Sequence, residues 1–185
     1  LRRINCKPTQ WFGAVFVRLI QGTPIVVFLM ILYYGIFGSA DISEILVAVI
    51  GFSINFAAYS SEMMRTGIET VDKGQSEAAL AMGYTKSQTF FKIVLPQAAR
   101  NFIPVLKGEF ISMVKMTSVA GYIAVQDLTK VSDIIRSRTM EAFFPLIVTA
   151  VIYFAVANVM TTFLSFAERE VLPKRNKRSV KGVSM

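Results

Sequence analysis

The sequence contains no histidine and a single cysteine, and both shortages narrow the chemistry open to it. Without histidine, no imidazole can act as a general acid, a general base or a metal ligand. Cys6 alone cannot form a disulfide within the chain or a cysteine-cluster zinc site. The chain also lacks the G-x-x-x-x-G-K-[ST] pattern that forms a phosphate-binding loop. We therefore expect no catalytic residues, no metal and no cofactor on this chain.

Charged residues are also scarce. They make up 17% of the 185 residues, whereas hydrophobic residues make up 54%, and the mean hydropathy is +0.52. This balance is typical of a membrane protein rather than a soluble domain. The net charge of +8 would suit nucleic acid, but the basic residues flank apolar runs and form no stripe of their own. The sequence thus predicts an all-α integral membrane protein with no nucleic-acid partner.

Long apolar runs predict four membrane spans, because about 20 residues are needed to cross a hydrocarbon core of about 30 Å. The predicted spans are residues 19–40, 45–61, 105–125 and 142–167. The third span holds Lys107, Glu109 and Lys115, and ionisable groups in a span usually face a bundle interior or a water-filled path. Together the spans define a transmembrane domain, residues 1–168. A basic tail, residues 169–185, should anchor the topology and attract anionic membrane lipid.

The distribution of lysine and arginine predicts the orientation. The first 18 residues carry four of them, residues 73–100 carry four, and the tail carries six, whereas the short loop after the first span carries none. Cytoplasmic segments of membrane proteins are enriched in these residues. The start, the centre and the end of the chain are therefore predicted to be cytoplasmic. Four spans also place both visible ends on one side of the membrane.

A polar segment of residues 72–104 separates the second and third predicted spans, and loops of this length are usually functional. Strong helix formers run from Glu77 to Met82. Gly83 follows where a helix should stop, because glycine tolerates the left-handed conformation of a helix end. The pattern predicts a short first helix that ends just before Gly83.

A second short helix is predicted from about residue 86 towards residue 97. Thr85 or Ser87 can cap its start, and Pro96 would kink it or lie at its end. The two helices are expected to lie along the cytoplasmic face of the membrane.

The small side chains of the first helix offer a surface that another protein can approach closely. Ala78, Ala79 and Ala81 are small, and Glu77 supplies one charge at the edge. Such a surface suits the transmission of a rigid-body movement from a partner. An amphipathic helix that rests on lipid headgroups is the alternative. The residue types alone leave both interpretations open.

The spacing of Glu77-Ala78-Ala79, Gly83 and Ile93-Val94-Leu95-Pro96 resembles the cytoplasmic EAA loop of bacterial ABC importer permeases. The resemblance extends over nearly the whole chain and is to the branch that takes up polar amino acids such as histidine, glutamine, glutamate and arginine. Other matching segments are Gln21-Gly22-Thr23-Pro24, Glu62 with Arg65 and Gly67, Gly74-Gln75, Lys115-Met116-Thr117-Ser118, Asp127-Leu128-Thr129 and Glu168-Arg169. Two positions depart from the family pattern, since arginine is usual at Gln21 and aspartate at Met116.

The resemblance implies a type I ABC importer permease in the bacterial cytoplasmic membrane. Its expected partners are two ABC ATPase subunits, a second permease subunit that is identical or different, and an extracytoplasmic amino-acid-binding protein or a binding domain fused upstream. Family members usually have five spans, so we expect one more span before Leu1. The residues expected to couple to the ATPase are Glu77, Ala78, Ala79, Gly83, Leu95 and Pro96.

Polar residues within the predicted spans are the candidates for a translocation pathway: Asn55, Glu109, Lys115, Thr117 and Ser118. Glu109 and Lys115 are six residues apart, so they cannot form an i,i+4 pair. Each either reaches a membrane interface or another helix, or lines the pathway and meets a zwitterionic or charged amino acid. Asn55 either hydrogen-bonds between helices or faces the pathway. Met116, in place of the usual aspartate, weakens an electrostatic argument at this position.

Two other functions compete with an ATP-driven importer. A secondary carrier would use an ion gradient, but the embedded acids are few and no internal repeat relates the halves, as many such folds would show. A non-transporting membrane scaffold could recruit a cytoplasmic protein through the same polar segment. Amino-acid uptake that requires ATP would distinguish the importer from both.

Overall fold

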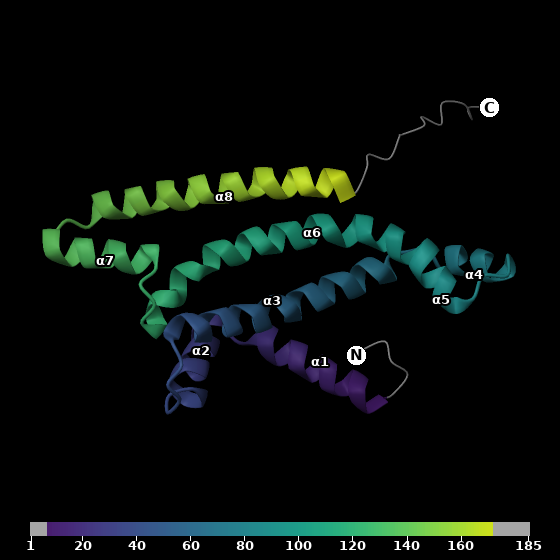
Figure 1. The fold of residues 1–185 in the computed structure, drawn as a ribbon, viewed down its shortest axis with the longest axis horizontal. Coiled ribbons are helices and arrows are strands. Elements are labelled where there is room, and N and C mark those ends of the chain that lie inside the picture. Colours follow the sequence, from purple (N-terminus) through teal and green to yellow (C-terminus); the bar gives the residue numbers. More distant parts are fainter. Residues whose placement is uncertain (1–6, 172–185) are drawn as a thin grey trace.

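The structure is a computed structural model that describes residues 7–171. The described residues form helices and no strand, which confirms the all-α prediction. Three long helices, α3 (Glu44–Glu69), α6 (Leu95–Met116) and α8 (Phe143–Val171), follow the long axis of the molecule (Figure 1). Of the predicted basic tail, residues 169–171 belong to α8 and the rest lies outside the described residues.

The first predicted span, residues 19–40, is not one continuous helix. Helix α1 (Lys7–Gly22) precedes a break, and α2 (Ile25–Met30) follows it and continues as a π-helix, η1 (Ile31–Ile36). The two parts are bent by 106°. Pro24 explains the break, because proline has no N–H to donate and disfavours helical backbone in the residue before it. Its own φ of −55° and ψ of 134° are those of extended chain.

The second predicted span lies within α3, which extends beyond residue 61 to Glu69. The hydroxyl of Ser43 caps its start by accepting a hydrogen bond from the Leu46 amide. At its other end the Arg65 guanidinium forms ion pairs with Glu62 and Glu69. These i,i+3 and i,i+4 pairs support the polar last turns of the helix, so α3 projects past its apolar part.

The third predicted span, residues 105–125, is divided between α6 and a 3-10 helix, η3 (Thr117–Ile123). The segment after it, which carries Lys130, Arg136 and Arg138 beside acidic residues, forms helix α7 (Leu128–Thr139). The Asp127 carboxylate caps α7 by accepting a hydrogen bond from the Lys130 amide at 2.9 Å. That local cap stabilises a helix which the charge pattern alone did not indicate.

Helices α3 and α8 are long and apolar enough to cross a membrane, and the bent pair of α1 with α2 and η1 adds a third candidate if it counts as one span. Helix α6 is not among these candidate spans, because it carries the charged residues Lys107, Glu109 and Lys115. The topology of four spans therefore stays a prediction.

The core lies at two places along α3. One cluster joins α2, α3 and η3 through Leu29, Phe52 and Ile123. The other joins α1 to α3 through Ile20 and Ala58. By contrast, only 6% of the apolar window of α8 is buried. An apolar surface of this extent indicates contact with lipid or with partner chains.

An ion pair joins α6 to α8. The Lys107 ammonium lies 2.6 Å from a carboxylate oxygen of Glu168, and both side chains are about three-quarters buried. The same ammonium donates to the Ser165 hydroxyl at 3.4 Å. Lys107, an embedded charge of the predicted third span, thus has a partner 61 residues away.

Removal of one member of this pair should destabilise the fold more than removal of both. In Lys107→Met, Glu168 keeps a largely buried carboxylate without its cation, which should lower the free energy of unfolding by about 1–3 kcal/mol. In Lys107→Met/Glu168→Gln no charge is left unpaired, so part of the loss should be recovered. Thermal unfolding of the detergent-solubilised protein measures both variants. A double variant that is less stable than Lys107→Met would contradict this account.

Candidate functional site

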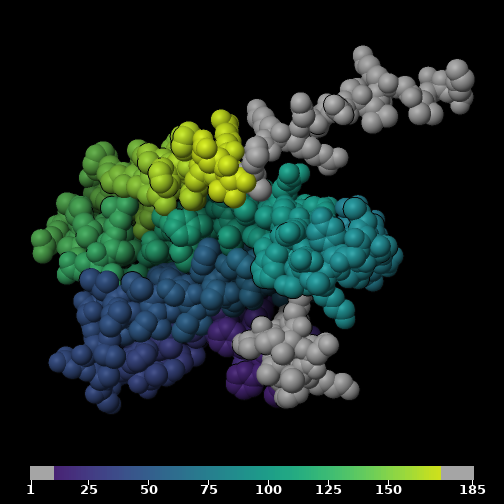
Figure 2. Space-filling view, turned by 45° about the vertical axis from the view of Figure 1, so that its right-hand side comes forward, coloured from purple at the N-terminus to yellow at the C-terminus, as the bar shows by residue number. Residues whose placement is uncertain are grey.

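The polar segment forms a lobe at one end of the molecule, which we call the α4–α5 lobe (residues 73–94). It consists of α4 (Lys73–Ala81), α5 (Lys86–Thr89) and a π-helix, η2 (Phe90–Val94). Figure 1 shows the lobe at the end where α3 finishes and α6 begins, and in Figure 2 it comes forward as a distinct teal protrusion. Helices are thus present in both predicted parts of the polar segment, and α4 stands apart from the long helices.

Helix α4 has a defined start and end. The Asp72 carboxylate caps its start by accepting a hydrogen bond from the Gly74 amide at 2.6 Å. The helix ends at Ala81, and Gly83 adopts a left-handed φ of 86°. The amide of Tyr84 then donates back to the Ala79 carbonyl at 3.1 Å. The predicted stop at Gly83 is confirmed, although the helix begins earlier than Glu77.

The second helix begins at a capping box. The Gln88 amide donates to the Thr85 hydroxyl at 3.2 Å, and the Thr85 amide donates to the Gln88 side chain at 2.9 Å. Of the two predicted caps, Thr85 is therefore the one used. The prediction of a short helix was wrong, because α5, η2 and α6 follow one another directly as far as Met116. The π-helix ends just before the first turn of α6, which holds Pro96, and a first turn tolerates a proline without an N–H.

The predicted coupling residues do not all lie on the surface. Glu77, Ala78 and Gly83 are exposed, whereas Ala79 is buried at 4% exposure. Met82, a residue type that usually packs in a core, is 77% exposed beside them. We call Glu77, Ala78, Met82 and Gly83 the α4 surface. Ala79 instead faces inward. Its burial depends on packing within the lobe, which could not be predicted from the sequence.

The other two predicted coupling residues lie at the start of α6. Leu95 is half-buried and Pro96 is exposed. They connect the lobe to the helix bundle and are not part of the α4 surface.

Two side-chain hydrogen bonds reach α6 from the polar segment. One comes from Thr70, just before α4, and the other from Gln75 within α4. The Asn101 amide donates to the Thr70 hydroxyl at 2.9 Å, and the Gln97 amide donates to the Gln75 side chain at 3.4 Å. The partners are 31 and 22 residues apart in the chain. Nothing in the local sequence signals these pairings, which join the end of α3 and α4 to α6 by polar contacts.

A largely apolar groove of about 570 Å³ lies between α3, α6 and η3. Phe52 and Phe56 line it from α3, and Phe110 and Met113 line it from α6. Among the predicted pathway residues only Thr117 lines this groove. The Thr117 hydroxyl donates to the Val114 carbonyl at 2.7 Å.

The other predicted pathway residues are dispersed. Asn55 is buried at 6% exposure within α3, Glu109 and Ser118 are half-buried, and Lys115 is exposed. Lys115 lies about 200° around the helix axis from Met113, at about 100° per residue, so it faces away from the groove. No ion pair joins Glu109 to Lys115 in the described part of the chain. The structure therefore does not bring the five residues into one site.

The chain is similar to a known family of membrane transport proteins. Residues 6–172 match the family described as binding-protein-dependent transport system inner membrane component. The chain belongs to this family. The permease chain therefore shares its fold with transmembrane subunits of ABC transporters.

Individual relatives cover most of the permease. It is 35% identical over 162 residues to a probable amino-acid ABC transporter permease protein, YckA, of Bacillus subtilis, with 87% of this chain and 72% of YckA aligned. It is 35% identical over 173 residues to the L-cystine transport system permease protein TcyB of the same organism, with 92% and 74% aligned. The arginine transport system permease protein ArtQ is 32% identical, with 89% and 76% aligned. These relatives confirm the resemblance that the sequence motifs indicated.

A solved structure gives the same result. The permease superimposes with a TM-score of 0.83 and 35% identity on a chain from the crystal structure of an amino acid ABC transporter with histidines. The superposition covers 91% of the permease and 79% of that chain. The helical bundle of an ABC permease is thereby confirmed.

Proposed function

We propose that this permease is the membrane-spanning subunit of an ATP-driven importer of amino acids. In this proposal a separate ATPase docks on the α4–α5 lobe, and ATP hydrolysis on that partner drives the change between outward and inward access. The amino-acid substrate class is supported by the named relatives, which include permeases for cystine and arginine.

The observation that carries the proposal is the α4 surface. It combines one charge, Glu77, with the small residues Ala78 and Gly83 and the exposed Met82. Helix α4 lies at one end of the molecule (Figure 1). Small side chains allow close approach, and an exposed methionine adapts to the shape of a partner. The left-handed Gly83 fixes where α4 ends. A docked partner would thus displace α4, a helix whose end is fixed by Gly83.

We assign the transmission of this displacement of α4 to the contacts between the lobe and α6. Ala79 anchors α4 inside the lobe, and Leu95 and Pro96 begin α6. The bonds Gln75–Gln97 and Thr70–Asn101 join the same elements. A displacement of α4 would therefore move α6, which contributes to the groove that holds Thr117.

The proposed pathway is formed with a second permease subunit. The apolar groove between α3 and α6 is open on its outer side and is a surface that another subunit can cover. Asn55, Glu109, Lys115, Thr117 and Ser118 remain the proposed polar contacts of the amino acid, and of these only Thr117 lines the groove of the single subunit. An extracytoplasmic binding protein, separate or fused upstream, would deliver the substrate. The proposed location is the bacterial cytoplasmic membrane, with both visible ends of the chain cytoplasmic.

Reconstitution tests the function directly. The complete permease with its copurifying subunits is placed in lipid vesicles, and uptake of labelled cystine, arginine and glutamine is measured with ATP on the side of the ATPase. We expect uptake of at least one amino acid that requires both ATP and the binding protein. Uptake driven by a proton or sodium gradient without ATP would identify a secondary carrier. A complex that binds an ATPase but moves no amino acid under any condition would identify a scaffold.

A further inference from the structure

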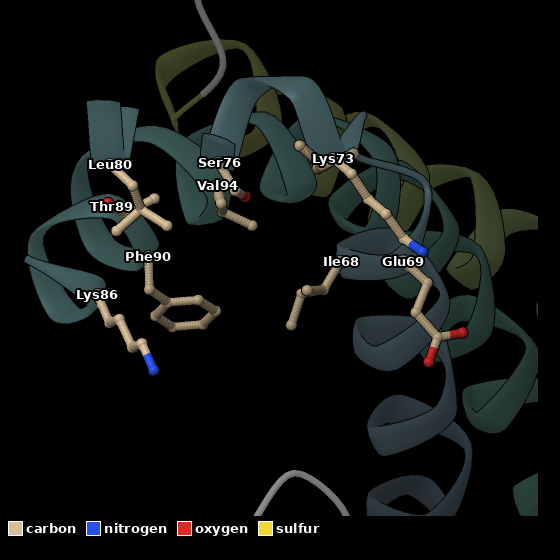
Figure 3. Close-up of a pocket in the computed structure, with 10 residues that line it drawn as sticks. Ile68, Glu69, Lys73, Ser76, Leu80, Lys86, Thr89, Phe90 and Val94 are labelled. Carbon is tan, nitrogen blue, oxygen red and sulfur yellow. The ribbon is translucent and has the colours of Figure 1, made fainter. Parts of the chain in front are cut away.

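A second surface of the α4–α5 lobe forms a cleft of about 550 Å³ between the end of α3, α4 and η2 (Figure 3). Its walls are mostly apolar and include Ile68, Val71, Leu80, Phe90 and Val94. A volume of this size is within the usual range for sites of small organic ligands. The cleft is separate from the groove between α3 and α6.

Two cations flank the apolar walls. Lys73 comes from α4 and Lys86 from α5, and Figure 3 shows them on opposite sides of the cleft. No ion pair is found for either lysine within residues 7–171. Glu69, the acid that also lines the cleft, forms an ion pair with Arg65, which pairs with Glu62 as well. Two lysines thus line the cleft against one carboxylate that is already ion-paired. The cleft therefore offers net positive charge around an apolar interior.

The cleft and Ala78 of the α4 surface lie on different sides of α4. Lys73, Ser76 and Leu80 follow one another at i, i+3 and i+7 and line the cleft. At about 100° per residue, Ala78 lies about 140° or more around the axis from each of them, whereas Glu77 lies about 40° from Lys73. A ligand in the cleft thus leaves Ala78 free for a docked protein and borders the α4 surface at Glu77.

We propose that this cleft binds an anionic phospholipid of the cytoplasmic leaflet. Its phosphate headgroup would interact with Lys73 and Lys86, and its acyl chain would lie against Leu80 and Phe90. The cleft lies where α3, a candidate membrane span, reaches its polar end, so in the proposed orientation it adjoins the headgroups of the cytoplasmic leaflet. The choice of occupant rests on this charge and apolar complementarity, and on the proposed cytoplasmic location of the lobe. A bound lipid would fix α4 against α3 and so link transport to the lipid composition of the membrane.

Lipid retention tests the proposal. The complete permease, with its copurifying subunits, is incubated with vesicles of phosphatidylglycerol or of phosphatidylcholine, repurified in detergent and examined by native mass spectrometry. We expect preferential retention of phosphatidylglycerol. Retention should fall by about fivefold for each lysine removed in Lys73→Gln/Lys86→Gln, since a basic residue near a membrane surface contributes about 1 kcal/mol.

Two matched variants and one competitor sharpen the test. Lys73→Arg/Lys86→Arg keeps both charges and should retain the lipid, and Lys92→Gln/Lys130→Gln removes two exposed lysines that do not line the cleft and should also retain it. Equal retention of the two lipids, or unchanged retention in the double glutamine variant, would overturn the proposal. Displacement of the lipid by inorganic phosphate alone would overturn it in favour of a soluble anion. Because the assay needs neither ATP nor uptake, a failed transport experiment with intact lipid retention would count against the proposed function alone.

Discussion

Replacement of Gly83 by valine should leave the permease in the membrane but lower ATP-dependent amino-acid uptake by roughly tenfold or more. Gly83 has a φ of 86°, and an added Cβ would meet no atom within 4 Å. The effect is therefore one of backbone conformation and not of a clash. A left-handed backbone costs an L-residue about 1–2 kcal/mol, and a β-branched residue is especially disfavoured there. A cost of this size shifts the end of α4 and with it the α4 surface, and 1.4 kcal/mol already corresponds to about tenfold in rate.

The matched control is Gly83→Asn, because asparagine adopts left-handed backbone more readily than other non-glycine residues. Uptake by the asparagine variant should stay near that of the wild type. Glu77→Lys provides a second variant, which reverses the charge of the α4 surface without strain and should also uncouple uptake from ATP hydrolysis. The measurement compares ATP hydrolysis and uptake by the same reconstituted complex. Normal uptake by both Gly83→Val and Glu77→Lys would refute the coupling role of this surface.

Gly83 and Thr85 show which parts of the site could be predicted from the sequence. The stop of α4 depends on the left-handed tolerance of one glycine, and the start of α5 depends on a threonine hydroxyl that reaches the amide three residues ahead. Both are local properties, and residue type and spacing were sufficient for the stop of α4, whereas for the start of α5 they left Thr85 and Ser87 open as caps. The break at Pro24 was missed, because residues 19–40 were predicted as one span, although the missing N–H of this proline is visible in the sequence.

The rest of the site depends on contacts between distant parts of the chain. The burial of Ala79 and the hydrogen bond between Gln97 and Gln75 arise only once η2 and α6 pack against α4. Likewise Lys107, read as an embedded charge, is paired with Glu168 by the packing of α8 on α6. The continuation of α5 into α6 was missed for a different reason. A proline usually signals a helix end, but the first turn of a helix tolerates it. Pro96 lies in the first turn of α6, because the π-helix η2 ends just before that turn.

Replacement of Gly67 by leucine should prevent accumulation of folded permease in the membrane. Gly67 is buried where α3 crosses α6, and a Cβ at this position would lie 2.8 Å from the Phe102 Cβ and 3.3 Å from the Ala98 carbonyl oxygen. Both contacts involve atoms fixed to the backbone of α6, so no flexible side chain can move aside. Overpacking of this kind costs about 1–3 kcal/mol for ordinary side chains, and leucine, whose branched end must also find room, should reach the upper end. Close approach through a small residue is a common way for helices to pack in a membrane.

Gly108→Ala is the control, since Gly108 lies in α6 and an added Cβ there meets no atom within 4 Å. Alanine is favoured over glycine in a helix by about 1 kcal/mol, so this variant should be at least as stable as the wild type. Gly67→Ala tests the intermediate case, because it adds the clashing Cβ and nothing more. The amount of monodisperse protein after detergent extraction and its unfolding temperature should rank Gly108→Ala first, then Gly67→Ala, then Gly67→Leu. Equal stability of Gly67→Leu and the wild type would mean that α3 and α6 can separate without loss, and the route proposed from α4 through α6 to the groove would then lack the rigid contact it requires.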